Sequence, residues 1–184
     1  MRSQLRSSVI VTTLALTLTC GLVTATSFRV AKAEDQIASA AEKGHPLATK
    51  ELRSIYENHT WHWKDGAAYF GTQDQTFKAW VGEGTESSYA DGSWSVNDQG
   101  RLCFRATWYV REGHRSATTC LEHRADDKNM YQRKLPKGDW YIFSHLPAQP
   151  GDEIQKMEPG DHVADGYQKN KRYVTTHAKR GRRR

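Results

Sequence analysis

The chain of 184 residues carries 27 lysines and arginines against 21 aspartates and glutamates, a formal net charge of +6. Its length allows one domain of ordinary size, and its composition excludes collagen-like, coiled-coil and polytopic membrane proteins. The charge is unevenly distributed, because residues 1–33 and 169–184 hold four and eight basic residues and no acid. The segment between them, 34–168, holds the remaining 15 basic residues and all 21 acids. A polyanion partner is therefore expected at the basic C-terminal end rather than in the acidic body.

The N-terminus has the pattern of a secretory signal peptide. Two arginines precede an uncharged stretch over residues 7–28. The following run, Ala31-Lys32-Ala33, places small residues at positions −3 and −1 of a cleavage before Glu34, as a signal peptide requires. The sequence therefore predicts an exported protein, periplasmic or secreted, whose signal peptide is cleaved after Ala33.

Two other fates of this segment stay open. Six threonines weaken the uncharged stretch as a permanent spanning helix, which needs about 20 predominantly apolar residues, yet an uncleaved anchor is one alternative. Lipid attachment at Cys20 is another, although Thr17 and Thr19 stand where a leucine and a small residue are wanted. Cleavage leaves residues 34–184, in which we expect no transmembrane segment.

Helical signals are confined to the start of the mature chain. Residues 34–43 are rich in alanine, and a second segment opens at Pro46, a residue that suits the first turn of a helix. Leu52 and Ile55 mark one face of that second segment. We therefore predict a helical lead-in over residues 34–58.

Residues 59–148 have the pattern of an antiparallel β-domain. Short runs rich in aromatic and β-branched residues alternate with glycine and Asx turns, among them Asp91-Gly92, and no helix of crossover length separates them. The pattern predicts a mainly β fold, an antiparallel meander that forms a small up-and-down, lipocalin-like barrel or a sandwich, with a short N-terminal helix. The predicted strands are 60–63, 67–70, 76–81, 87–90, 93–97, 101–110, 117–124, 129–134 and 140–145.

Cys103 and Cys120 are the two cysteines that remain after cleavage, and an oxidising compartment favours their pairing. Residues 101–110 alternate between polar and apolar side chains, which predicts a half-buried strand with Cys103 on its polar face. Residues 111–116 have the composition of a hairpin loop, so a cross-strand disulfide would close about 16 residues and contribute roughly 3 kcal/mol. A redox pair or metal thiolates are the alternatives, but C-x-x-C spacing is lacking and Cys120-x-x-His123 is half a zinc site.

From Pro150 onward the strand pattern ends. Prolines, glycines and charged residues dominate, and the segment has too few apolar residues to order a core. We predict a flexible, disordered C-terminal tail over residues 149–184, with a transient contact through Ile154 and Met157.

Several runs of the β-domain together resemble a known family. They are TWHWKDGAAYF (60–70), YADGSWSV (89–96), GRLCFRATW (100–108), TTCLEHR (118–124) and YQR (131–133). Over about residues 47–146 the chain resembles the domain of unknown function 995 family, small exported proteins of alphaproteobacteria. The resemblance supports an exported location and the paired cysteines. The family has no agreed activity, so no catalytic residue can be transferred, and the basic tail lies outside the resembling region.

The sequence lacks recognised catalytic and cofactor motifs. It has no G-x-S-x-G elbow, no phosphate-binding glycine loop and no H-E-x-x-H pair. His59 and His62 are spaced i, i+3, which places them on opposite faces of a strand. We therefore predict no catalytic residue, no cofactor and no metal site.

Aromatic side chains are the main candidates for ligand binding. The chain has six tryptophans and eight tyrosines, and aromatic faces beside polar donors suit sugars and other amphipathic ligands in the mouth of a small barrel. Trp80 lies on the polar face of its strand, so we expect it to be an exposed contact. Trp61, Trp63 and Tyr109 are the other candidate ligand-binding residues, although large aromatics usually fill the core.

The basic C-terminus is a separate candidate site. Cations without intervening acids attract an anionic envelope surface or an acidic polysaccharide, although a solvated tail has the same composition. Export argues against nucleic acid as the partner. The candidate polyanion-binding residues are Lys169, Lys171, Arg172, Lys179, Arg180, Arg182, Arg183 and Arg184.

The leading hypothesis is a non-enzymatic periplasmic or secreted β-domain that binds an envelope component, a glycan or a lipid. One alternative is an enzyme that acts on envelope polysaccharide through carboxylates such as Glu83, Glu86, Asp91 or Glu122. A structural protein with no ligand is the other.

Overall fold

The computed structural model describes residues 22–178. The chain divides into two compact units, Met1–Ala33 and Glu34–Arg184, and helix α1 (Leu22–Lys43) crosses the boundary between them. The described strands and the buried core all lie in the second unit. The predicted cleavage after Ala33 falls at this boundary, and most of the predicted signal peptide lies outside the described residues. No helix that the structure describes is long and apolar enough to span a membrane.

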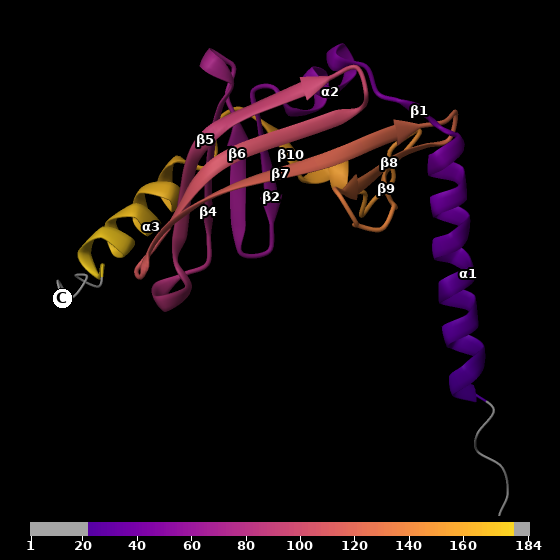
Figure 1. The fold of residues 1–184 in the computed structure, drawn as a ribbon, viewed down its shortest axis with the longest axis horizontal. Helices are drawn as coiled ribbons and strands as arrows, with labels where there is room; N and C mark the ends of the chain where they lie inside the picture. The colour runs from indigo at the N-terminus through magenta and orange to yellow at the C-terminus, as the bar shows by residue number, and fades with distance from the viewer. Residues whose placement is uncertain (1–21, 179–184) are drawn as a thin grey trace, which may run out of the picture. The chain divides into compact units, whose positions relative to one another are not determined.

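Ten strands form one antiparallel sheet in the order β10-β2-β3-β4-β5-β6-β7-β8-β9, and β1 pairs with β7 (Figure 1). The prediction of a mainly antiparallel β meander with a short N-terminal helix is confirmed, and the sheet curls into a half-barrel. The elements after α1 are β1 (His45–Pro46), α2 (Thr49–Tyr56), β2 (His59–Trp63), β3 (Gly66–Phe70), η1 (Gln73–Gln75), β4 (Thr76–Val81), η2 (Gly84–Glu86), β5 (Ser88–Asn97), β6 (Arg101–Val110), β7 (Gly113–Ala125), β8 (Asn129–Lys134), β9 (Tyr141–His145), η3 (Glu153–Lys156), β10 (Met157–Pro159) and α3 (Ala164–Thr176).

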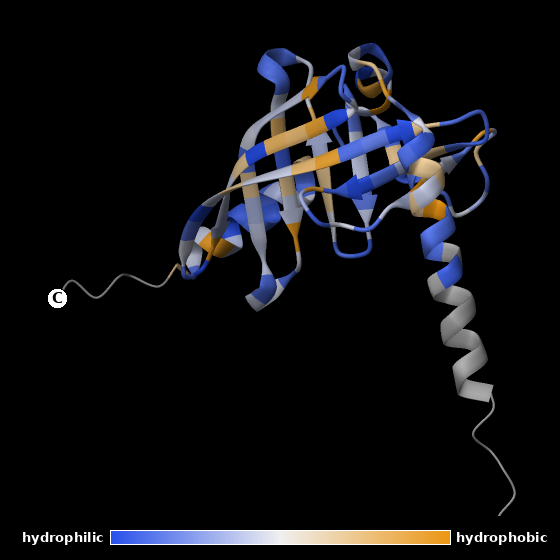
Figure 2. Cartoon of the chain, turned by 45° about the vertical axis from the view of Figure 1, so that its right-hand side comes forward, coloured by the Kyte–Doolittle hydropathy of each residue, from blue (hydrophilic) through white to orange (hydrophobic). Residues whose placement is uncertain are grey.

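The core occupies the inner face of the curled sheet. Helix α2 places Leu52, Ile55 and Tyr56 on one face at i, i+3 and i+4 spacing, and all three are buried. They pack against aromatic residues of the strands, among them Phe70 and Trp94. The strands alternate hydrophobic and hydrophilic residues along their length, as Figure 2 shows, so the same side of each strand faces the core.

Side-chain hydrogen bonds from η3 reach β9, at one edge of the sheet, and β2, the strand next to the other edge. On β9, His145 donates its backbone N–H to Asp152 at 2.8 Å, and its ring Nδ1 lies 2.7 Å from the same carboxylate. On β2, the indole N–H of Trp61 donates to Glu153 at 2.8 Å. Because Asp152 and Glu153 are adjacent at the start of η3, this short helix bridges β9 and β2.

Asp91 and Gly92 were expected to form a turn between two strands, and this prediction is wrong. Both residues lie inside β5, where Gly92 pairs with Phe77 on β4 and with Ala106 on β6. A Cβ atom at Gly92 would lie 2.0 Å from the carbonyl oxygen of Arg105. The glycine therefore permits a close approach of β5 and β6 and does not reverse the chain.

The β6–β7 hairpin holds the disulfide that the alternation pattern predicted. Cys103 and Cys120 are directly opposed in the register, and their sulfur atoms are 2.09 Å apart. The turn is shorter than the expected loop over 111–116, because β6 ends at Val110 and β7 begins at Gly113. The disulfide therefore joins two strands that are already paired along their whole length.

Residues 153–176, which composition placed in a flexible segment, form η3, β10 and α3. Helix α3 buries Tyr167, Asn170 and Val174 against β4 and β5. The Asn170 amide donates to three backbone carbonyls, those of Val81, Gly82 and Ser88, at 2.9 to 3.0 Å. A few aromatic contacts and buried hydrogen bonds thus order a segment whose mean hydropathy is low.

We predict that Gly92→Val lowers the free energy of unfolding by about 2–3 kcal/mol or more, because a branched side chain must displace the β6 backbone. Urea unfolding followed by tryptophan fluorescence measures this change. The matched control is Ser95→Val, an exposed position on the same strand, which should stay within about 0.5 kcal/mol of the parent. Equal stability of the two variants would contradict the close-approach role of Gly92.

Candidate ligand-binding pocket

A cavity of about 250 Å³ lies on the inner face of the half-barrel. Phe77 and Phe104 stack in its wall, with ring centroids 4.7 Å apart and planes 10° apart. The apolar lining comes from β2, β3, β4 and β6, and the polar lining from β7 and β8. The lining residues are Trp61, Trp63, Ala68, Phe70, Phe77, Phe104, Trp108, Thr119 and Lys134.

One cross-strand row of small side chains runs along the sheet beside this cavity. Ala68, Ala79 and Ala90 are consecutive partners on β3, β4 and β5, and each is at most 3% exposed. The row continues to Trp61 on β2 at one end and to Trp108 on β6 at the other. At about 4.8 Å per strand, the two tryptophans lie roughly 19 Å apart along the sheet. Of the three alanines, Ala68 lines the cavity, together with the two tryptophans at the ends of the row.

The lining is apolar except at its margin. Lys134 is the one charged residue among the nine that line the cavity, and its side chain is exposed. Thr119 adds a hydroxyl group. The indole N–H of Trp61 is already bonded to Glu153, so the walls offer few free polar groups. This arrangement suits a ligand with an apolar body and one anionic group.

A buried polar network lies deeper in the same interior. The Nε2 atom of His123 lies 2.8 Å from the Tyr56 hydroxyl and 2.6 Å from the Gln132 amide nitrogen. The Tyr141 hydroxyl donates to the Gln132 carbonyl oxygen. The Nδ1 atom of His123 lies 3.2 Å from the Gly100 carbonyl oxygen, an arrangement that fits a neutral ring with its proton on Nδ1.

Burial sets the protonation of this network. Desolvation lowers the pKa of His123 to about 4, against the opposing effects of the Gly100 carbonyl and Glu122. Burial likewise raises the pKa of Tyr56 and of Tyr141 above the ordinary value. The network is therefore uncharged at neutral pH, and its hydrogen bonds connect α2 to β7, β8 and β9. We assign it a structural role.

The predicted aromatic residues fall into two groups. Trp61 and Trp63 line the inner cavity. Trp80 and Tyr109 lie on the outer face, where they pack against the cluster of buried residues formed with α3. A Cβ atom at Gly166 of α3 would lie 2.3 Å from the Trp80 ring, so α3 covers the tryptophan that we expected to be an exposed contact.

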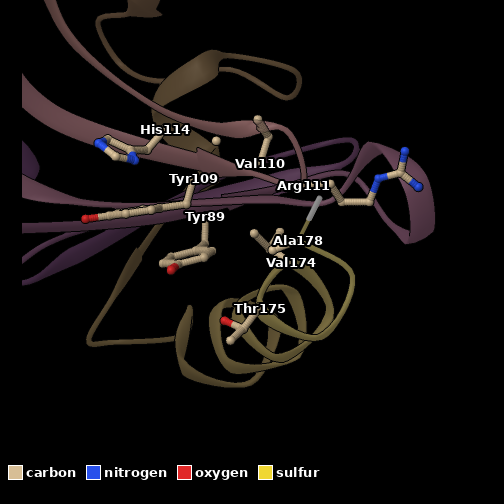
Figure 3. A pocket seen from close by; sticks show the side chains of 9 residues that line it. Tyr89, Tyr109, Val110, Arg111, His114, Val174, Thr175 and Ala178 are labelled. Carbon is tan, nitrogen blue, oxygen red and sulfur yellow. The ribbon is translucent and has the colours of Figure 1, made fainter. Parts of the chain in front are cut away.

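Tyr109 belongs to a second, outer depression of about 280 Å³ (Figure 3). It stacks on Tyr89, with ring centroids 4.7 Å apart and planes 11° apart, and His114 lies on its other side at 5.7 Å. Val174 and Thr175 of α3 form the opposite wall.

Sequence reasoning missed four important residues of the inner cavity, Phe77, Phe104, Trp108 and Lys134. The sequence does indicate that Phe104 and Trp108 lie on the same face of their strand, because an even number of residues separates them in a run that alternates cleanly. It does not show which residues of the other strands lie beside them in the sheet. Lys134 carried no signal, since its place at the cavity depends on the pairing of β8 with β7.

Three of the four carboxylates considered for an enzyme bind separate partners. Glu122 is buried and forms an ion pair with Arg133 at 2.6 Å, and Asp91 accepts a hydrogen bond from Tyr167 at 2.7 Å. Glu83 pairs with Lys169, and Glu86 lies in η2. None of these four lines the inner cavity.

The histidines that were considered as a metal pair are also separate. The His59 ring bonds to the Glu57 carbonyl at 2.8 Å, whereas His62 pairs with Glu158 at 3.0 Å. Within residues 22–178, no group of three histidines, cysteines, aspartates or glutamates is placed to hold a metal ion.

Three of the predicted polyanion-binding residues lie on α3. Lys169 forms the ion pair with Glu83 at 2.7 Å, and the Lys171 ammonium lies 5.5 Å from the centroid of the Tyr167 ring. Arg172 is exposed. The other five, Lys179, Arg180, Arg182, Arg183 and Arg184, lie outside the described residues.

Fold and site together define a half-barrel protein with an aromatic-lined cavity on the concave face of one antiparallel sheet. The chain belongs to the family described as "Protein of unknown function (DUF995)", whose model matches residues 21–163. The suspected family membership is thereby confirmed, and the match extends beyond the resembling region on both sides. No curated protein and no solved structure matches the chain.

We predict that acid destabilises the fold through His123. Its pKa falls from the ordinary value near 6.5 to about 4 on folding, so the unfolded chain binds the proton more tightly. The neutral His123 ring therefore contributes about 3 kcal/mol to the free energy of unfolding above pH 6.5, and this contribution is lost as the pH falls toward 4. Urea unfolding across this range measures the loss. His123→Gln should reduce the change in the free energy of unfolding over this pH range, whereas the exposed control His114→Gln should leave it unchanged. The same pH dependence in His123→Gln as in the parent would refute the assignment to His123.

Proposed function

We propose that this chain is an exported, non-enzymatic protein that binds an amphipathic lipid of the cell envelope. The apolar part of the lipid occupies the inner cavity, and its anionic head lies beside Lys134. The observation that carries the proposal is the cavity lined by Ala68 and six aromatic side chains, with Trp61 and Trp108 at the two ends of one cross-strand row. A hollow of this shape and polarity gives an apolar chain a dry environment and gives one anion a cation at the margin.

The lining favours a lipid over a glycan. A sugar carries many hydroxyl groups, and each one that is buried without a partner costs free energy. Seven of the nine lining residues are aromatic or alanine, and beyond the indole N–H groups of the tryptophans the lining offers only the Thr119 hydroxyl and the Lys134 ammonium as polar groups. An acyl chain needs no such partners and gains free energy in proportion to the apolar area that it buries.

Three features support export. The sequence has the order of a signal peptide with small residues before Glu34, and the boundary between the two compact units falls at the same place. The Cys103–Cys120 pair fits an oxidising compartment. Residues 37–41 pack against Tyr131 and Trp140, so the new N-terminus of a cleaved chain stays attached to the domain.

Binding without turnover is supported by the same interior. Tyr56, His123 and Tyr141, whose pKa values are strongly shifted by burial, are bonded to one another or to Gln132. Three carboxylates of the polysaccharide-hydrolysis alternative, Glu83, Asp91 and Glu122, are bonded to other side chains, and none of its four carboxylates lines the cavity.

We predict that dansylundecanoic acid, a fluorescent fatty acid, binds the protein saturably with energy transfer from tryptophan. Ala68→Leu places a large side chain in the cavity lining and should weaken binding at least tenfold. Lys134→Gln removes the cation and should weaken binding of the acid by about fivefold, because an exposed ion pair contributes up to about 1 kcal/mol. The methyl ester of the probe should bind both the parent and Lys134→Gln equally.

The matched control for the charge is Lys137→Gln, an exposed lysine in the loop after β8, which should bind the acid like the parent. Urea midpoints of all variants are compared, and Lys134→Gln keeps the test valid if Ala68→Leu unfolds. Lack of saturable binding by the parent, or unchanged affinity in Ala68→Leu with a native fold, would overturn the proposal.

We also predict that the chain expressed in an exporting bacterium is recovered from the periplasm or medium with Glu34 as its first residue. Intact-mass spectrometry measures this, and the mass should be two hydrogens lower than that of the reduced 151-residue chain because of the disulfide. Ala33→Leu places a large residue at position −1 and should block processing, whereas the conservative Ala33→Ser should be processed. Recovery of the unprocessed chain from the cytoplasm would contradict export.

A further inference from the structure

Two segments far apart in the sequence meet at one end of the sheet. The tip of the β6–β7 hairpin, residues 110–115, lies beside the last turns of α3 and the residues after it, 171–178 (Figure 1). Both segments line the outer depression of Figure 3. We call these two segments together the basic end.

The basic end is strongly cationic. It holds four basic residues, Arg111, Arg115, Lys171 and Arg172, and a single acid, Glu112. Arg111 pairs with Glu112 at 3.1 Å, and its guanidinium extends away from the tyrosines of the depression (Figure 3). Arg115, Lys171 and Arg172 are exposed. The sequence after Ala178 adds five more cations and no acid.

The same end also exposes apolar surface. Val110 at the hairpin tip is 40% exposed. It borders a shallow groove of about 400 Å³ that is also lined by Trp108 and Arg115. Trp108 lines both this groove and the inner cavity, and Arg115 is its cross-strand partner on β7. The row that shapes the lipid cavity therefore ends at the basic end.

We propose that the basic end is a docking surface for an anionic lipid bilayer. The cations are attracted to the negative surface, and Val110 enters the interface between headgroups and acyl chains. The groove beside Trp108 then opens toward the membrane, so a lipid can pass between bilayer and cavity without crossing water. The combination of exposed valine and cations favours a bilayer over an acidic polysaccharide, which offers no apolar layer. The passage of lipid depends on the proposed function, whereas the docking does not.

The test is sedimentation of residues 34–184, the compact unit that holds the sheet and its core, with vesicles of stated composition. Vesicles of phosphatidylglycerol and phosphatidylcholine in equal parts should bind the protein, and pure phosphatidylcholine vesicles should not. Salt should weaken the binding, because exposed charges are screened. The double variant Arg111→Gln/Arg115→Gln should bind about 30-fold more weakly, since each surface cation contributes about fivefold.

The matched control is Arg101→Gln/Arg105→Gln, which removes the same charge from exposed positions on β6 away from the tip. It should reduce vesicle binding by far less than the tip variant. Equal losses in the two double variants, or no binding to the phosphatidylglycerol vesicles, would overturn the proposal. So would binding to soluble polygalacturonate without binding to vesicles, which would identify the partner as a polysaccharide.

A second variant separates docking from lipid binding. Ala68→Leu changes the cavity lining and not the basic end, so it should sediment with vesicles like the parent. If dansylundecanoic acid fails to bind while vesicle binding follows the tip variant, the docking surface stands and the cavity proposal fails. If dansylundecanoic acid binds but the tip variant binds vesicles like the parent, the docking proposal is wrong and the cavity proposal stands.

Discussion

The structure depends on small side chains at the centre of a strongly curled sheet. Gly92 permits β5 and β6 to approach each other where a Cβ atom would meet the Arg105 carbonyl at 2.0 Å. Beside it, the alanine row places three small side chains in the middle of the concave face. Large aromatic side chains line the cavity next to Ala68 and do not fill it. The proposed binding surface therefore depends on which residues the sheet brings together on its concave face.

The hairpin of β6 and β7 connects the two functional proposals. Its paired strands are joined by the Cys103–Cys120 bond near one end and carry the basic tip at the other. Trp108 lies between them and borders both the inner cavity and the groove at the tip. The proposed lipid site and the proposed membrane-facing surface thus share one disulfide-linked hairpin. The α3 helix adds cations to that end while it covers the outer face at Trp80.

Several parts of the fold could be predicted because their signals are local. Alternation in 101–110 placed Cys103 on the polar face, and the hairpin composition placed Cys120 opposite it. The prediction of a turn at Asp91-Gly92 was wrong because this dipeptide occurs both in turns and where two strands approach closely. Only the pairing with the neighbouring strand distinguishes the two cases. The ordering of α3 was missed because Asn170 acts through three hydrogen bonds to carbonyls of another segment, which no measure of composition records.

The sequence by itself determined the class of the fold, the position of the disulfide and the predicted cleavage after Ala33. These depend on period-two alternation, turn residues and short motifs, which act between residues close in the chain. Tertiary structure alone decided that Trp61 and Trp63 line a cavity, that Trp80 is covered by α3, and that Lys134 lies at the cavity margin. The physical reason is that a row across five strands joins residues as distant as Trp61 and Trp108. Its members become neighbours only when the register and curvature of the whole sheet are set.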